Sequence, residues 1–198
     1  MHINMSRHVI VLFLAVFGWH LSEIKCDDDC PTIYSRSDWN ATPPTDSKPL
    51  SIIPPPYVVV HHSATASCKN HQDCRTLVKS IQNYHMQDEG WCDIGYNFLI
   101  GGDGGIYEGR GWGIHGAHVV KYNARSIGIC LLGNYQVEPP PDRQVQALQD
   151  LIKCGTQTGN IQGKYHLIGH RQGSATLCPG DYLYKLVENM TNFDPDPQ

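Results

Sequence analysis

Two stretches of the sequence carry side chains that can bind a metal ion. His61 and His62 end an apolar, β-branched run, and His170 and Cys178 lie in a loop, 169–180, bounded by glycine and proline. Zinc accepts imidazole and thiolate ligands, and three protein ligands leave a fourth position open, as in catalytic zinc sites. Because neighbouring residues of a strand face opposite sides, only one of the two adjacent histidines can join His170 and Cys178. The spacing is not that of a zinc finger, so half of a disulfide is an alternative role for Cys178.

Strands and helices must bring these residues together. The run 57–61 is apolar without interruption, which predicts a strand buried on both faces. A glycine-rich loop, 101–105, predicts a hairpin between two short strands. Asp73 is the expected N-cap of a helix that begins at Cys74 and stops before Gly90. The predicted strands are 57–61, 96–100, 106–108, 126–132 and 165–168, and the predicted helices are 74–86, 142–155 and 181–190.

These elements alternate irregularly, and one pair forms a hairpin. We therefore expect an α/β fold, a single domain with a central mixed β-sheet flanked by α-helices.

The N-terminus has the pattern of a secretory signal peptide. Arg7 and His8 precede an apolar run, 9–17, that is too short to span a bilayer as a helix. We expect cleavage near Ser22, with a buried N-terminal helix as the alternative reading. The expected parts are a signal peptide, 1–22, an irregular arm, 23–56, and a folded domain, 57–193, with no later segment apolar enough to cross a membrane.

If the protein is secreted, its eight cysteines can form disulfides, because disulfides persist in an oxidising compartment. If Cys178 binds metal, the other seven leave at least one thiol unpaired. Sequons at Asn40 and Asn189 would accept N-glycans if they are exposed. The net charge of −4 provides no basic field to attract nucleic acid or anionic lipid.

Several long motifs resemble the peptidoglycan recognition protein family, in its short secreted type. They include VVHHSAT at 59–65 and GWCDIGYNFLIG at 90–101. The motifs extend from about Cys30 to the last predicted helix and stand in the family's order. Further matching stretches are 84–86, 107–112, 116–118, 126–129 and 169–180. The resemblance implies the fold of the phage-lysozyme-type amidases, with a ligand groove on one face of the sheet.

The resemblance also implies an activity. In catalytic members of the family the zinc ligands match His61, His170 and Cys178, a tyrosine that assists catalysis matches Tyr96, and a threonine matches Thr176. This chain would then be a zinc-dependent N-acetylmuramoyl-L-alanine amidase of extracellular, antibacterial innate immunity. Many members have lost the cysteine, so the alternative is a non-catalytic sensor that acts through signalling partners. Without the resemblance, the tyrosine is a core aromatic and the threonine hydroxyl binds its own backbone.

The family contacts muramyl peptides of peptidoglycan at positions that match His62, His85, Gly90, Trp91, Arg110, His118 and Asn123. The Gly90-Trp91 pair resembles that of members favouring diaminopimelate, and Arg110 matches an arginine that reads the extra carboxylate of that residue. A guanidinium can hold a carboxylate through two hydrogen bonds. Considered alone, Arg110 could instead form a salt bridge with Glu108, His85 could be a helix-end residue, and His118 could belong to a structural turn.

Similar family members bridge the cysteines that match Cys68 and Cys74, and those that match Cys30 and Cys154. The first bridge would tie the loop after the 57–61 strand to the groove edge. The second would pin the N-terminal arm to the helix beginning at Asp142. The pairing of the three others stays open: Cys26, Cys92 and Cys130.

Overall fold

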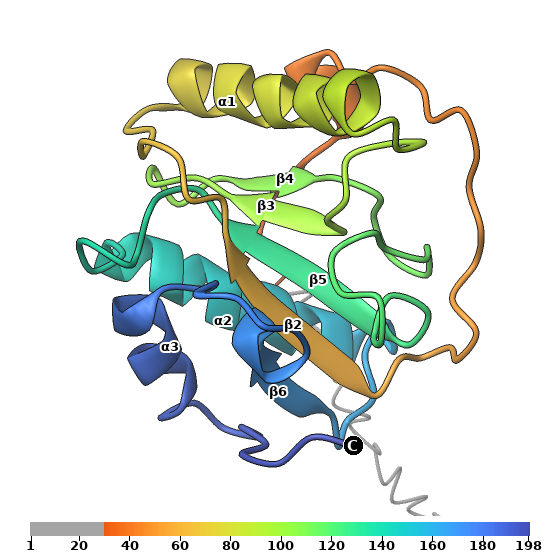
Figure 1. Ribbon diagram of the computed structural model, residues 1–198, viewed down its shortest axis with the longest axis vertical. Coiled ribbons are helices and arrows are strands. Elements are labelled where there is room, and N and C mark those ends of the chain that lie inside the picture. Colours follow the sequence, from red (N-terminus) through yellow and green to blue (C-terminus); the bar gives the residue numbers. More distant parts are fainter. Residues whose placement is uncertain (1–29) are drawn as a thin grey trace, which may run out of the picture.

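A computed structural model describes residues 30–198 as one sheet with helices on both of its faces (Figure 1). The expected signal peptide and Cys26 lie outside the described residues. The strands are β1 Ile33–Tyr34, β2 Tyr57–His62, β3 Phe98–Ile100, β4 Ile106–Glu108, β5 Ser126–Leu131 and β6 His166–Gly169, and the α-helices are α1 His71–Asn83, α2 Asp142–Gln157 and α3 Asp181–Val187. Within residues 30–198, no helix has the length and apolar character needed to cross a bilayer.

The sheet is mixed, as the sequence predicts. Its strand order is β1-β4-β3-β5-β2-β6. The β3–β4 hairpin is the antiparallel pair, and the remaining neighbours run parallel. The predicted α/β fold is therefore confirmed.

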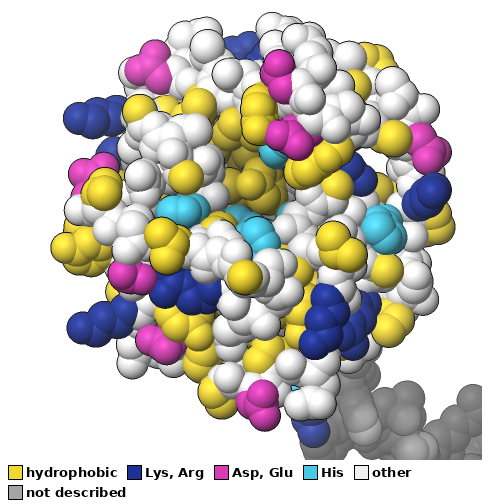
Figure 2. Space-filling model, in the orientation of Figure 1, with side chains coloured by type: hydrophobic (Ala, Val, Ile, Leu, Met, Phe, Trp, Pro, Cys, Tyr) yellow, Lys and Arg dark blue, Asp and Glu magenta, His cyan; other side chains and the backbone are white. Residues whose placement is uncertain are grey.

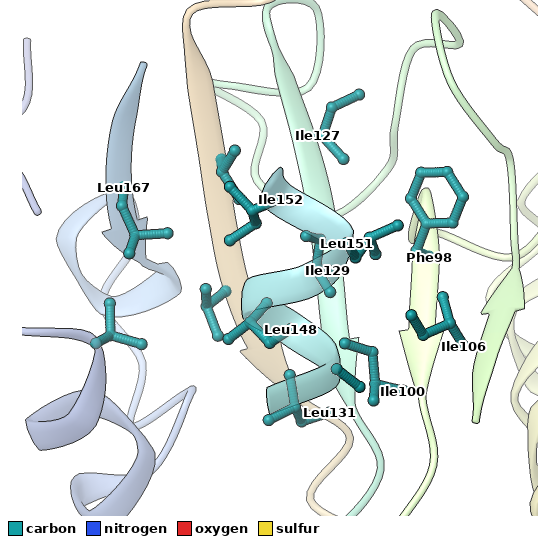
Figure 3. Packing of buried hydrophobic residues seen from close by; sticks show 14 of the residues in the cluster. Phe98, Ile100, Ile106, Ile127, Ile129, Leu131, Leu148, Leu151, Ile152 and Leu167 are labelled. Atoms are coloured by element: carbon teal, nitrogen blue, oxygen red, sulfur yellow. The ribbon is translucent and has the colours of Figure 1, made fainter. Parts of the chain in front are cut away.

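The two faces of the sheet are covered by different elements. Side chains alternate along each strand, so Ile129 of β5 faces α2 and α3, whereas Cys130 faces α1. On the first face, Leu148 and Leu151 of α2 pack into the cluster around Ile129 (Figure 3). All six residues of β2 are buried, which confirms the prediction from its unbroken apolar run.

Helix α1 begins earlier than predicted. Its N-cap is Asn70, whose side chain accepts a hydrogen bond from the backbone N–H of Asp73 at 3.0 Å. The expectation that Asp73 caps the helix is wrong, because an asparagine three residues upstream provides the capping oxygen. After Asn83 the chain continues as a π-helical turn, Tyr84–Asp88. The chain leaves this turn through Gly90, whose φ of +69° favours glycine.

The N-terminal arm is less irregular than expected. It contains β1 and a 3₁₀ helix, Arg36–Trp39, in which Trp39 is buried against the α1 face. A disulfide between Cys30 and Cys154 ties the start of the arm to α2, as the family resemblance implies. The other implied disulfide, Cys68–Cys74, is also present and joins the loop after β2 to α1.

Candidate functional site

Three potential metal ligands meet where β2 and β6 end. The two strands are parallel and pair Val60 with Gly169, so the next residues, His61 and His170, come side by side. Their ring centroids are 4.6 Å apart. The loop after His170 brings Cys178 back to this edge, and the ligand atoms of the three residues all lie within 4.8 Å of one another. The structure thus brings together the predicted set of two imidazoles and one thiol.

The loop that returns Cys178 is held by Arg171. The backbone N–H of Arg171 donates to the carbonyl of Cys178 at 2.9 Å. Its guanidinium pairs with the carboxylate of Asp181, at the start of α3, at 2.8 Å. These contacts close the loop and link it to α3.

The spacing and protonation of the three groups suit a metal ion. The Nδ1 atom of His61 lies 3.8 Å from Sγ of Cys178, close to the ~3.6 Å expected between two corners of a tetrahedral zinc site. Burial, followed by the nearby histidines, lowers the pKa of His61 well below its usual value, and burial also lowers that of His170. Both imidazoles are therefore neutral at pH 7 and offer lone pairs.

Cys178 needs a positive charge nearby to ionise. Burial raises the pKa of its thiol to about 12, although the backbone N–H of His62, 3.4 Å from Sγ, opposes this shift. A cation bound between the three groups would stabilise the thiolate. The donor set of His61, His170 and Cys178 fits zinc, which prefers nitrogen and sulfur ligands.

Tyr96 lies beside the candidate ligands. Its ring centroid is 5.2 Å from that of His61. Burial, followed by the nearby thiols of Cys130 and Cys178, raises the pKa of its phenol well above the usual value. The phenol is therefore protonated at neutral pH and can donate a proton or a hydrogen bond.

Thr176 lies in the exposed part of the loop. Its Oγ1 accepts the backbone N–H of Cys178 at 3.2 Å, a short-range turn contact of the kind that the residues alone suggest.

His62 and His118 are turned into the protein. The Nδ1 atom of His62 accepts the backbone N–H of Tyr135 at 3.2 Å, on the other side of β2 from His61. His118 is 9% exposed, and its Nδ1 lies 3.0 Å from Nε2 of His61. Its Nε2 lies 3.4 Å from Oγ of Ser126.

A pocket of about 320 Å³ gathers three of the predicted ligand contacts, Trp91, Arg110 and Asn123. Arg110 donates from Nε to the carbonyl of Ile94 at 2.7 Å and from Nη1 to that of His115 at 2.8 Å, rather than to the carboxylate of Glu108. Within residues 30–198, its Nη2 has no hydrogen-bond partner. Asn123 uses Oδ1 to accept the N–H groups of His118 and Val119, which leaves its amide NH₂ available.

His85 packs between this pocket and the candidate metal ligands. It stacks on Trp91 with centroids 4.6 Å apart, and it lies edge-on to Tyr96 at 5.6 Å. Its Nδ1 accepts the N–H of Gly95 at 3.1 Å, so a neutral His85 carries its proton on Nε2. In the space-filling view this face is hollowed below α1, and histidine side chains border the hollow (Figure 2).

Comparison with known proteins decides the family. The sequence model described as N-acetylmuramoyl-L-alanine amidase (Amidase_2) matches residues 52–181. The chain is 42% identical over 166 residues to peptidoglycan recognition protein 1 of Bos indicus, covering 83% of this chain and 87% of that protein. The chain belongs to the peptidoglycan recognition protein family.

Solved structures of other peptidoglycan recognition proteins have the same fold. Wild-type Drosophila PGRP-LB superposes with a TM-score of 0.81 at 42% identity, covering 82% of this chain and 96% of that one. Peptidoglycan recognition protein-LE, solved in complex with tracheal cytotoxin, described as monomeric diaminopimelic acid-type peptidoglycan, gives a TM-score of 0.80 at 39% identity. It covers 82% of this chain and 95% of its own.

Two residues near the site escaped the sequence analysis. Ser126 contacts His118, and Cys130 is the neighbour of His61 in the ladder between β5 and β2. A signal for both was present: alternation along the predicted strand 126–132 puts Ser126, Gly128 and Cys130 on one face. The sequence alone did not say that this face is the one that carries His61.

Proposed function

We propose that this member of the peptidoglycan recognition protein family is a secreted zinc-dependent amidase, which hydrolyses the bond between N-acetylmuramic acid and L-alanine in bacterial peptidoglycan. The observation that carries the proposal is the convergence of His61, His170 and Cys178, with ligand atoms within 4.8 Å, beside the partly buried Tyr96. Two neutral imidazoles and one thiol provide three ligands and leave the fourth position of a tetrahedral zinc ion for water or substrate, which suits a catalytic rather than a structural metal site.

In this reaction, the side chains of the site would act as metal ligands and as hydrogen-bond donors. His61, His170 and Cys178 would hold the ion, which when bound supplies Lewis acidity to activate water and polarise the scissile carbonyl. Tyr96 keeps its phenol proton at neutral pH and would donate a hydrogen bond to the oxyanion as it forms. Thr176 accepts from the backbone of Cys178, so its hydroxyl proton is free to donate to the substrate.

The pocket beside the metal ligands would bind the stem peptide. Trp91 offers an apolar face, and Arg110 keeps Nη2 free to donate to a carboxylate while its other contacts hold the guanidinium in place. This arrangement supports a preference for diaminopimelate-type peptidoglycan. The solved complex of peptidoglycan recognition protein-LE with such a fragment supports the same ligand class.

Features outside the groove support secretion and a role in innate immunity outside the cell. Two disulfides, Cys30–Cys154 and Cys68–Cys74, suit an oxidising compartment, in agreement with the expected signal peptide. The sequon residues Asn40 and Asn189 are both exposed and would be open to glycosylation.

The test is release of stem peptides from purified diaminopimelate-type peptidoglycan, with zinc, with a chelator, and with two variants, Cys178→Ser and His170→Gln. His166→Gln is the matched control, because His166 lies at the far end of the same strand, β6, and pairs with Asp194. We expect zinc-dependent release by the wild type and the control, and loss of about a hundredfold or more in the two site variants.

The opposite outcome is also informative. Firm binding of the same peptidoglycan by wild type without any release would overturn the amidase. The protein would then be a non-catalytic sensor that binds through the pocket of Trp91 and Arg110 and acts through signalling partners.

A further inference from the structure

A chain of hydrogen-bonding groups runs inward from the candidate metal ligand His61. Nε2 of His61 lies 3.0 Å from Nδ1 of His118. Nε2 of His118 lies 3.4 Å from Oγ of Ser126, and this hydroxyl lies 2.8 Å from the carbonyl oxygen of Tyr122. His61, His118 and Ser126 are all buried, and Ser126 is 0% exposed.

The last acceptor of this hydrogen-bond series, the carbonyl of Tyr122, fixes which atom donates in each of the preceding hydrogen bonds. The carbonyl of Tyr122 can only accept, so the single hydroxyl proton of Ser126 points to it. Ser126 Oγ must then accept from His118, which places the proton of a neutral His118 on Nε2. Nδ1 of His118 is consequently an acceptor, and His61 donates to it from Nε2. A neutral His61 is left with its lone pair on Nδ1, the atom that lies 3.8 Å from Sγ of Cys178.

Packing holds the His118 ring in this position. A Cβ atom added at Gly116 would come within 2.3 Å of Cδ2 of His118, and one added at Gly128 within 2.4 Å of the same atom. The ring therefore lies between two glycines, where other residue types would displace it. The backbone of Gly128 is itself fixed, because its N–H donates to Oδ1 of Asn97 and its carbonyl accepts the N–H of Asn97, each at 2.9 Å.

From this geometry we infer that His118 and Ser126 are positioning residues for the metal site: they hold His61 in the tautomer and orientation that turn the Nδ1 lone pair toward the metal. This goes beyond the ligand contact that the resemblance implies for His118. Both of its ring nitrogens have partners inside the protein, so neither is free for a muramyl peptide. Metal-bound histidines commonly depend on such a partner for their second nitrogen. The inference rests on the proposed metal site.

The first test uses metal-free wild-type protein and does not depend on zinc binding or activity. Long-range ¹H–¹⁵N NMR of the imidazoles reports which ring nitrogen carries the proton. We expect His61 to be protonated on Nε2 and not on Nδ1. Protonation of His61 on Nδ1 would overturn the inference, even if the enzyme proves to be a zinc amidase.

The second test compares zinc affinities by competition with a chromophoric chelator. Ser126→Ala removes the acceptor for His118 without touching the groove, and we expect zinc to bind about 10- to 100-fold more weakly. His118→Leu should lose at least as much, whereas His118→Asn, which keeps an acceptor oxygen near the position of Nδ1, should recover part of the loss. His71→Leu is the matched control, since His71 is a partly buried histidine bonded to the Tyr107 hydroxyl at 3.0 Å, remote from the site.

The outcomes separate this inference from the proposed function. If wild type binds no zinc, the proposed amidase fails, and the tautomer of His61 in the metal-free protein still decides the inference. If wild type binds zinc and Ser126→Ala binds it equally well, the inference is overturned while the amidase stands. If His118→Leu does not fold, Ser126→Ala and the NMR measurement give the answer.

Discussion

Arg110 divides its five N–H donors between the protein and the groove. Nε and Nη1 bind the carbonyls of Ile94 and His115, which belong to the two loops that border the pocket. Burial lowers the pKa of its guanidinium, but an arginine stays charged at any physiological pH. Arg110 therefore has a structural task at the same place where a ligand carboxylate would bind.

We predict that Arg110→Ala lowers both ligand binding and stability. Removing the side chain leaves the carbonyls of Ile94 and His115 without their donors, which should cost about 1–3 kcal/mol in the free energy of unfolding. Denaturant unfolding of the ligand-free protein measures this loss. Binding of diaminopimelate-type fragments should fall more than binding of lysine-type fragments. An unchanged free energy of unfolding would contradict the structural task, and equal losses on both fragments would contradict the proposed carboxylate contact.

At the level of single residues, the sequence predicted which residues form the candidate site better than it predicted the contacts that each side chain makes. The convergence of His61, His170 and Cys178 was expected from zinc chemistry and the family motif. The inward orientation of His118 was not, because it depends on the close approach of Gly128, which belongs to a different element, β5. A single sequence does not reveal which glycines make room for which ring.

At the level of elements, two disulfides of very different span hold the sheet and its helices. Cys30–Cys154 joins residues 124 apart in sequence and attaches the N-terminal arm to α2, whereas Cys68–Cys74 spans 6 residues at the start of α1. Closing a longer loop removes more entropy from the unfolded chain. The long bridge should therefore contribute more to stability.

We predict that replacing Cys30 and Cys154 by alanine costs about 4–5 kcal/mol, and that the same replacement of Cys68 and Cys74 costs about 2–3 kcal/mol. Guanidinium unfolding of the two double variants under identical conditions gives the comparison, and each variant serves as the control for the other. A larger loss in the Cys68–Cys74 variant would show that native contacts of the bridge, not loop closure, dominate.

Elements with strong periodic patterns were predictable, and their ends were not. The strand beginning at Tyr57 follows its unbroken apolar run, and helix α2 follows its helical apolar period. The start of α1 was missed because Asn70 and Asp73 are both good caps, and tertiary placement of the Cys68–Cys74 loop selects between them. Strand β1 was missed because two residues in an arm rich in proline carry no period, and pairing with β4 creates the strand.

For the whole molecule, buried histidines link stability to pH. Burial lowers the pKa of His62 and of His85 to about 4 and that of His118 to about 3. In the unfolded chain each titrates near 6.5. Because the folded state disfavours the charged form, the stability that these groups contribute is fully present above pH ~6.5 and is lost as the pH falls toward 4. Acid should therefore loosen the same region that carries the candidate site.

We predict that the metal-free protein becomes less stable between pH 7 and pH 5, and that His85→Asn reduces this dependence. With a folded pKa of about 4, His85 alone accounts for a loss on the order of 2 kcal/mol at pH 5. Asparagine can still accept the N–H of Gly95 but does not titrate, so the variant separates the hydrogen bond from the proton. Urea unfolding with a chelator present, at both pH values, measures the difference. Gln149→Asn is the control, because Gln149 is exposed and does not titrate, so this substitution should leave the fall between the two pH values unchanged. If His85→Asn loses as much stability as wild type on acidification, the pH dependence comes from other groups.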